Sequence, residues 1–185
     1  MRPSHQPTLW RTCRVLANRK RLQIFALAIR RPGQTVSAAA EHLKLSLPAA
    51  SQYLRALEAR GLLTCRRVGR RVEYRPPSAT ADDPAREIVT ALRLVFRRKA
   101  KPVETLFRMA TAFTHPRRLD VFRAVKNGAD SFDKVQAVTG ISRRALLRHL
   151  SKLEARDFVK SEIGVYTIAN QANPFGRVLA HLALK

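Results

Sequence analysis

Cysteine and long apolar runs are both scarce in this sequence. The two cysteines, Cys13 and Cys65, stand far apart, with no Cys-x-x-Cys motif and no nearby pair of histidines. A disulfide framework or a zinc site is therefore not expected, and a reducing compartment suits the chain best. The longest apolar run, IFALAI at residues 24–29, falls far short of the roughly 20 residues that span a bilayer. Since MRPSHQPTLW lacks the apolar region of a signal peptide, we expect a soluble cytoplasmic protein.

Motifs for catalysis are missing as well. No Ser, His and acidic residue stand at a local spacing suited to a nucleophile, and no glycine-rich phosphate loop occurs. We therefore expect no enzyme activity and no cofactor. The histidines His42 and His149 neighbour expected core positions and are interpreted as packing residues, and both cysteines are expected to be buried as small apolar side chains.

Acidic residues are few, and positive charge is in excess. The chain has 36 Lys and Arg against 13 Asp and Glu, a net charge of +23. Residues 1–77 hold 16 basic and 3 acidic side chains, and residues 78–185 hold 20 and 10. Self-repulsion of this size indicates a polyanionic partner, with nucleic acid the leading candidate. An acidic membrane surface, bound through the basic amphipathic stretch at 85–98, stays open as a weaker alternative.

One stretch of the chain occurs twice. PAASQYLRALEARGLL, residues 48–63, matches RALLRHLSKLEARDFV, residues 144–159, at six of sixteen positions. NRKRLQIFALAI, from residue 18, likewise parallels HPRRLDVFRAV, from residue 115. Self-similarity at a fixed offset is the signature of a repeated structural unit. We predict a first unit at residues 1–78, a linker with an amphipathic helix at 79–103, and a second unit at 104–185.

Each unit is predicted to hold several helices followed by a β-hairpin. In the first unit, helices are expected at 9–17, 21–29, 37–43 and from Ser46 to Gly61, with Ser37 and Ser46 as N-caps. Ala50, Leu54 and Leu57 recur at helical spacing as a buried stripe, and alternation around Gly69 indicates a hairpin. The second unit repeats this order, with helices at 104–113, 117–126, 131–138 and 142–156, and a hairpin at 158–168. Helices at 85–98 and 174–184 are expected to form an interface.

Two helices joined by a tight turn and followed by a hairpin are typical of a winged helix-turn-helix. The stretch LKLSLPAASQYLRALEARGLLTCRRVGRRVEYR, together with LANRKRLQIF before it, resembles the ArsR-type winged-helix repressors. The resemblance is stronger in the first unit than in the second. It implies a tandem winged-helix protein of mainly α class with small β-hairpin wings. Lys44 replaces the glycine usual in that family's turn, whereas Gly140 keeps it, and the metal ligands of the family's metal sensors are missing, so no metal effector is expected.

The resemblance assigns four DNA-facing positions to the first recognition helix. They are Ser46, Ser51, Gln52 and Arg55. These positions lie off the buried stripe, and Gln and Arg suit adenine and guanine edges. The corresponding set in the second unit is more cationic, which indicates phosphate anchoring more than base reading. It consists of Ser142, Arg143, Arg144, Arg148 and Lys152, with Leu147 on the same face.

The two hairpins differ in charge. The first wing carries Arg66, Arg67, Arg70 and Arg71 around Gly69, with Arg75 beyond, and suits phosphates or a narrow minor groove. The second offers Lys160 against Glu162. The first unit is therefore expected to supply most of the affinity for duplex DNA, and the second to orient the protein.

The resemblance also suggests why the unit is repeated. ArsR-type proteins usually act as homodimers with one recognition helix per half-site, and a tandem chain can form that pair internally as a pseudo-dimer. A homodimer stays open as the alternative. We interpret the chain as a transcriptional regulator, in the sense of a repressor, associated with the nucleoid. Two alternatives stay open: a replication-initiation or nucleoid-architectural factor, and a first-unit DNA binder whose second unit, through Leu147 and the reduced wing, contacts a protein.

Overall fold

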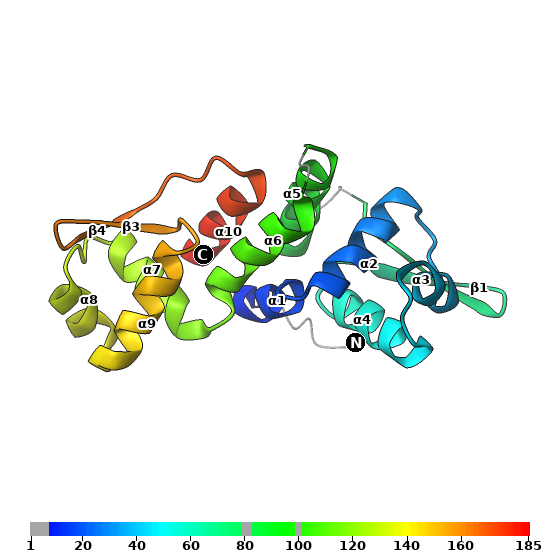
Figure 1. Cartoon of the computed structure of the whole chain (residues 1–185), viewed down its shortest axis with the longest axis horizontal. Helices are drawn as coiled ribbons and strands as arrows, with labels where there is room; N and C mark the ends of the chain where they lie inside the picture. Colours follow the sequence, from blue (N-terminus) through cyan, green and yellow to red (C-terminus); the bar gives the residue numbers. More distant parts are fainter. Residues whose placement is uncertain (1–7, 79–82, 99–100) are drawn as a thin grey trace.

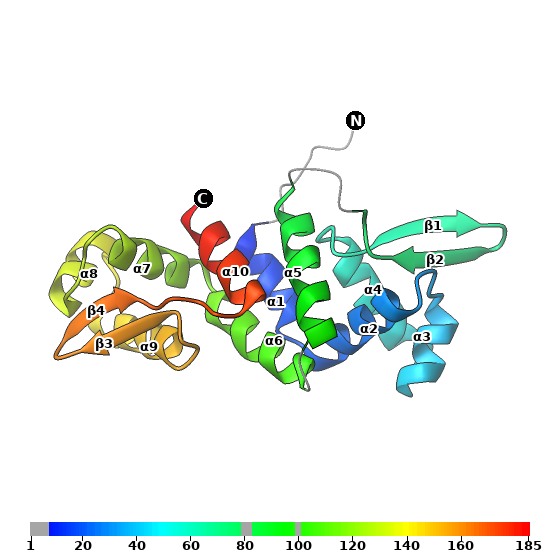
Figure 2. The same cartoon turned by 90° about the horizontal axis from the view of Figure 1, so that it is seen from above.

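The computed structural model describes residues 8–78, 83–98 and 101–185 of an elongated molecule. Its middle is formed by α1 (Leu9–Leu16), α5 (Pro84–Arg98), α6 (Pro102–Ala110) and α10 (Pro174–Leu184) (Figure 1). A β-hairpin lies toward each end, which Figure 2 shows from above. The mainly helical class with small antiparallel hairpins is confirmed. Part of the linker expected after residue 78 lies outside the described residues.

The first unit contains the expected helices and hairpin. After α1 come α2 (Arg19–Arg30), α3 (Val36–Leu43), α4 (Leu47–Glu58), β1 (Thr64–Val68) and β2 (Arg71–Arg75). One cap prediction is wrong: Thr35, not Ser37, is the N-cap of α3, and its Oγ1 accepts from the backbone N–H of Ala38 at 3.2 Å. Both hydroxyls can cap, but the helix already begins at Val36, which places Ser37 inside it.

A tight turn joins α3 to α4. Lys44 adopts the left-handed conformation there, with φ of 51°, and the Leu45 N–H bonds the Ala40 carbonyl at 2.8 Å. Lysine therefore takes the geometry for which glycine is the usual residue. The Ser46 hydroxyl then accepts from Ala49 N–H at 3.3 Å and opens α4 as predicted. The stripe of Ala50, Leu54 and Leu57 is buried, so the opposite face of α4 is left to solvent.

The second unit has the same order of elements. After α6 come η1 (Thr111–Phe113), α7 (Pro116–Lys126), α8 (Phe132–Thr139), α9 (Arg143–Glu154), β3 (Val159–Glu162) and β4 (Val165–Ile168). Gly140 ends α8 with φ of 61°, the conformation that Lys44 has in the first unit. Phe113 packs edge-on against Phe122 and Phe158, with ring centroids 5.2 and 4.7 Å apart. These fully buried rings join η1, α7 and the start of the hairpin.

The two units share one hydrophobic core. Helix α5 packs against α10 and α6, while α1 packs against α6, η1 and α10. Ile88 and Leu92 of α5 and Leu179 of α10 are buried in a cluster that also contains Leu22 and Phe122. The helices expected to form an interface therefore pack together, and burying their apolar faces fixes one unit relative to the other. None of the helices in the described residues has the length and apolar character needed to cross a membrane.

Candidate nucleic-acid interface

The recognition helix expected in the first unit presents polar side chains to solvent. Gln52 and Arg55 are exposed on the face of α4 opposite its buried stripe. Ser51 is half-buried, and the hydroxyl of Ser46 is already engaged as the N-cap. Gln52 and Arg55 are therefore the best placed of the four predicted residues to reach a base edge, and Ser46 is suited to a backbone contact at the helix start.

The first hairpin carries a concentrated positive charge. Arg66, Arg67, Arg70 and Arg71 are all exposed, and β1 has no buried residue along its length. Arg75 differs from these four because its Nη2 bonds the Glu73 carboxylate at 3.0 Å on the same strand. The β1–β2 hairpin extends beyond α3 (Figure 2), so four arginines stand on an arm that makes few contacts with the core. Such an arm suits a phosphate backbone or a narrow minor groove.

The hairpin also overturns the expected burial of Cys65. Its side chain is exposed, and Sγ donates to the Glu58 carboxylate at 3.0 Å, whereas Cys13 is fully buried as expected. Cys65 is small and apolar, but β1 has no buried residue along its length, so the prediction fails there.

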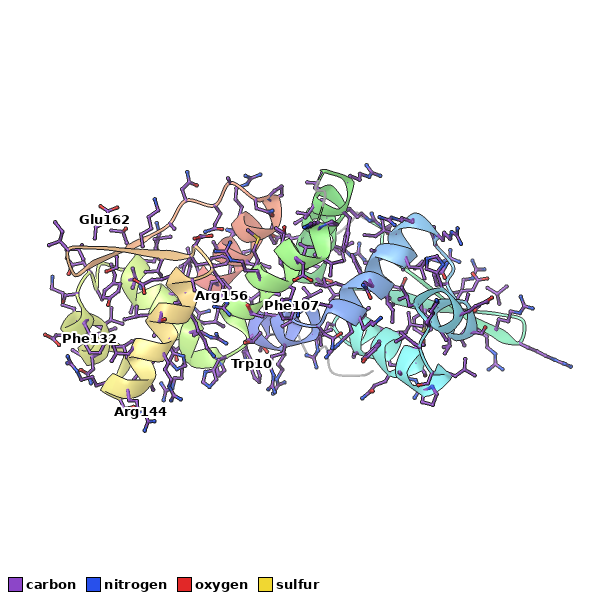
Figure 3. All side chains as sticks on the ribbon, viewed as in Figure 1. Trp10, Phe107, Phe132, Arg144, Arg156 and Glu162 are labelled. Carbon is purple, nitrogen blue, oxygen red and sulfur yellow. The ribbon has the colours of Figure 1, made fainter. Side chains whose placement is uncertain are left out.

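The recognition helix expected in the second unit is more cationic. Five predicted residues are exposed at its start and along one face: Ser142, Arg143, Arg144, Arg148 and Lys152. The Arg143 guanidinium lies over the Phe132 ring, 4.7 Å from its centroid, which steadies it at the end of α9. Figure 3 shows Arg144 reaching away from the ribbon at the same end. Leu147 is 50% exposed in the middle of this face.

The second hairpin has little net charge. Lys160 and Glu162 are exposed, and Ile163 at the turn is fully exposed. In Figure 3, Glu162 lies on the upper side of the unit, across from Arg144 at the lower end of α9. The acidic side chain of this hairpin therefore does not face the surface that Arg144 occupies.

Helices α4 and α9 lie along the same side of the molecule. In Figure 1 both are on the lower side, toward opposite ends, with α1 between them. In Figure 2 both lie farther from the viewer than the hairpin strands above them, which agrees with a common side. Since the units share one core, the two exposed faces have a fixed separation.

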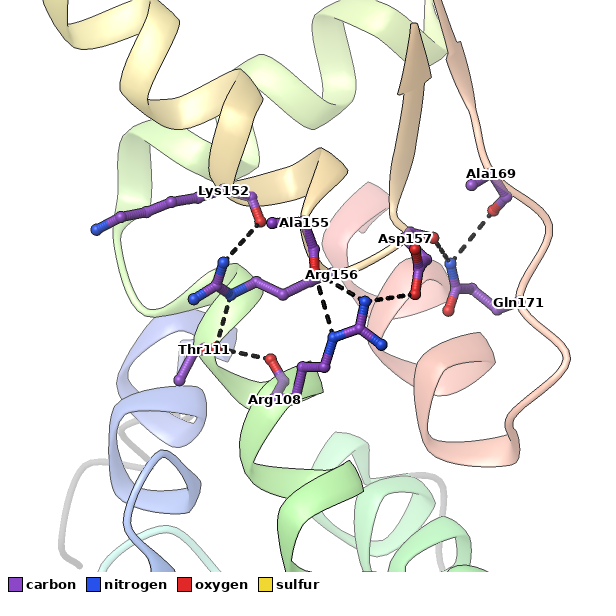
Figure 4. Close-up of polar contacts among 8 residues, drawn as sticks. All are labelled: Arg108, Thr111, Lys152, Ala155, Arg156, Asp157, Ala169 and Gln171. Carbon is purple, nitrogen blue, oxygen red and sulfur yellow. Dashed lines mark hydrogen bonds and ion pairs between the residues drawn. The ribbon is translucent and has the colours of Figure 1, made fainter.

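A polar network holds the end of α9 against the middle of the molecule (Figure 4). Arg108 of α6 donates to the Ala155 carbonyl at 2.8 Å and to the Asp157 carboxylate at 2.8 Å. Arg156 donates from Nε to the Thr111 hydroxyl at 2.7 Å. Gln171 also donates to the Asp157 carbonyl. Several charge-assisted bonds at one helix end restrict its direction, so α9 is held firmly relative to α6 and η1.

Sequence reasoning missed a group of two histidines and one arginine beside this network. His115 lies 5.1 Å from His149, ring centroid to ring centroid, and the neighbouring Arg118 is 4% exposed. We call these three residues the junction cluster. The signal was present in the repeat, which aligns His115, Arg118 and His149 with Asn18, Arg21 and Tyr53. Of the two histidines interpreted as packing residues, His149 is half-buried, but His42 is exposed on α3, so that interpretation of His42 is wrong.

The comparisons with known proteins support a DNA-binding role for the first unit. A family described as winged helix-turn-helix DNA-binding matches residues 18–64, which take in α2, α3, α4 and the first residue of β1. No curated protein and no solved structure matches the chain. Residues 18–64 are thus similar to winged helix-turn-helix DNA-binding domains. Within the ranges that the structure describes, no three His, Cys, Asp or Glu side chains gather as metal ligands.

Proposed function

We propose that the protein is a transcriptional regulator that binds duplex DNA with both units as an internal pseudo-dimer. The observation that carries the proposal is the common side occupied by α4 and α9, two exposed polar helices fixed by one core. Each helix would enter the major groove of one half-site, about 10 base pairs or one turn apart, or a multiple of this. Repression would follow from occlusion of a promoter.

The two units are proposed to contribute differently. The family match and the four exposed wing arginines favour the first unit as the main source of affinity and base reading. The face of α9 is rich in Arg and Lys, which contact phosphates without reading sequence. An asymmetric DNA site is therefore expected, with one half more strictly defined than the other.

The test is selection of bound fragments from random duplex DNA, followed by an insertion series. We expect one chain per site and a footprint over two unequal half-sites. Inserting about 5 base pairs between them should abolish joint binding, because it turns one half-site to the opposite face of the duplex. A sharp footprint that tolerates every insertion would show that only one unit binds, and uniform coating would indicate an architectural protein instead.

A second candidate function has its own observation. Val138 is 70% exposed, Leu147 is 50% exposed and Ile163 is fully exposed, all in the second unit. Large apolar side chains on a surface often mark protein contacts, so the second unit could be a protein-interaction module. The variant Leu147→Ser, which copies Ser51 of the first unit, distinguishes DNA binding from protein binding by the second unit. Unchanged DNA affinity and an unchanged footprint, together with loss of regulation, would favour the protein contact.

A further inference from the structure

Among the residues that the structure describes, no carboxylate pairs with the junction cluster. Arg118 is 4% exposed, and its Nε is shut off from solvent without an acceptor, although Nη2 donates to the Thr114 hydroxyl. Burial first, and then the charge of Arg156, lower its pKa from the usual value. The nearest acidic side chain along α7, Asp120, is already paired with Arg117 at 3.6 Å. A buried guanidinium among like charges is unfavourable unless an anion joins it.

The groups that act on the cluster come from α1, α7 and α9, together with Arg156 after α9 and the Cys13 thiol of α1, which faces Arg118. Arg14 of α1, Arg117 of α7, and Arg148 and Lys152 of α9 act on one or both histidines, and none of the groups that act on them is a carboxylate. The electrostatic potential at the junction cluster is therefore positive, with contributions from both units. Positive side chains that converge in this way attract an oxyanion.

The backbone adds to this attraction. His115 is the N-cap of α7, and its Nδ1 accepts from the Arg117 N–H at 3.1 Å. In the neutral ring that acceptor role leaves the proton on Nε2, which becomes a donor. The first turn of α7 also brings the positive end of the helix dipole to the same place, although Pro116 has no N–H and the N–H groups of Arg117 and Arg118 already bond His115.

We infer that the junction cluster binds one phosphodiester oxyanion of duplex DNA, between the stretches contacted by α4 and α9, and takes up protons as it does so. The inference rests on the proposed function. Its support is position: the turn between η1 and α7 lies on the lower side of the molecule, between α9 and α1 (Figure 1). A duplex spanning α4 and α9 would pass over this turn.

Proton uptake follows from the state of the histidines in the free protein. Burial, and then His115 and Arg118, lower the pKa of His149 to about 4, and burial with the neighbouring cations lowers that of His115. Both rings are therefore neutral near pH 7. A bound phosphate favours the charged form and raises both pKa values. By linkage, DNA affinity then rises as pH falls, by up to about tenfold per pH unit for each proton taken up.

The first unit supplies a matched variant. At the aligned positions it has Asn18, which caps α2, and Tyr53, whose ring lies 5.9 Å from the Arg21 guanidinium. His115→Asn/His149→Tyr therefore copies an arrangement that this chain already folds. Neither replacement titrates between pH 5 and 8.

The experiment measures DNA affinity of the full chain between pH 5.5 and 8 at constant ionic strength. We expect wild-type affinity to rise severalfold as pH falls, and the double variant to bind more weakly at pH 6 without that rise. Its slope of log affinity against log salt should be shallower by about 0.9, one phosphate contact. Equal pH profiles and equal salt slopes in the two proteins would overturn the inference even with DNA binding intact.

A variant of Arg118 and a titration with a small anion test the inference further. Arg118→Met removes the buried charge; we expect a melting temperature equal to or above that of wild type, with weaker DNA binding, whereas unchanged DNA binding by the folded variant contradicts the inference.

Inorganic sulfate, whose charge is constant over this pH range, tests a free anion. If sulfate shifts the histidine ring NMR signals while DNA does not, the site belongs to a small anion and the DNA assignment fails. If no duplex binds wild type at any pH, the proposed function itself fails.

Discussion

The two units of this chain agree in backbone and differ in surface. Both have helices followed by a hairpin in the same order, and the turns before α4 and α9 each contain a left-handed residue, Lys44 in one and Gly140 in the other. The hairpin of the first unit bears four exposed arginines, whereas that of the second bears Lys160 and Glu162. Two units with the same order of elements can thus keep their buried stripes while their solvent faces differ, since packing constrains only the former.

Helices α4 and α9 differ in the type of polar side chain they expose as well as in charge. Exposed Gln52 of α4 can form paired hydrogen bonds with a base, whereas the exposed face of α9 offers guanidinium and ammonium groups around Leu147. The proposed function therefore assigns sequence reading to the first unit and phosphate contacts to the second.

The largest effect should come from breaking the core that joins the units. Leu92 of α5 is fully buried where α5 packs against α10 and α6. Leu92→Ala should lower the free energy of unfolding by about 2–5 kcal/mol, through lost apolar contact and the cavity left behind. Denaturant unfolding followed by far-UV circular dichroism measures it. Because one core serves both units, they should still unfold in a single transition.

The matched control is Leu184→Ala at the end of α10. Leu184 is 41% exposed, so its replacement should change the unfolding free energy by less than about 1 kcal/mol. Two separate transitions in wild type, with only one shifted by Leu92→Ala, would show that the units fold independently.

The next effect concerns the two hairpins. Arg70→Ala/Arg71→Ala should weaken duplex binding by about tenfold or more and flatten the salt dependence by up to about 0.9 per lost phosphate contact. Binding titrations at several salt concentrations measure both quantities. Lys160→Ala in the second hairpin is the control, and we expect it to change affinity little. An equal loss of DNA affinity from the variants of the two hairpins would contradict the proposal that the first unit supplies most of the affinity.

Much of this fold follows from local signals in the sequence. The buried stripe of α4, the Ser46 cap and the glycine between two β-prone runs are each set by neighbours within a few residues, and the structure places each as predicted. The repeat then carried the same reading into the second unit. The N-cap of α3 was predicted two residues too late, because Thr35 and Ser37 both carry hydroxyls that can cap a helix. The residue at which the helix begins decides between them.

The junction cluster could not be predicted in the same way. Arg118 reads as one exposed arginine among many, and only the packing of η1, α7 and α9 buries it to 4% exposure. His115 and His149 are far apart in sequence, and no local pattern joins them. Burial of a charged side chain depends on contacts between elements, so the sequence signals the positions through the repeat but not their environment.

His149 of the second unit aligns with Tyr53 of the first. Since the pKa of His149 is lowered to about 4 in the folded protein, the unfolded chain binds a proton more readily below its usual value of 6.5. Stability should therefore be constant above about pH 7 and should fall as the pH is lowered from 6.5 to 4. Thermal unfolding across this range, compared with His149→Tyr, measures the contribution. An equal decline in the variant would assign the pH dependence to other groups.

The smallest effect should come from exchanging the two turn residues. Lys44 holds φ of 51° and Gly140 holds φ of 61°, and a Cβ added at Gly140 would meet nothing within 4 Å. Gly140→Lys should therefore cost only the backbone strain of a left-handed lysine, about 1 kcal/mol, offset in part by a less flexible unfolded chain. Lys44→Gly should change stability by less than about 1 kcal/mol in the opposite direction. Denaturant midpoints of the two variants and of the double exchange test this. If both single changes destabilise by the same amount, then contacts of the Lys44 side chain, and not the backbone conformation, set the preference at this turn.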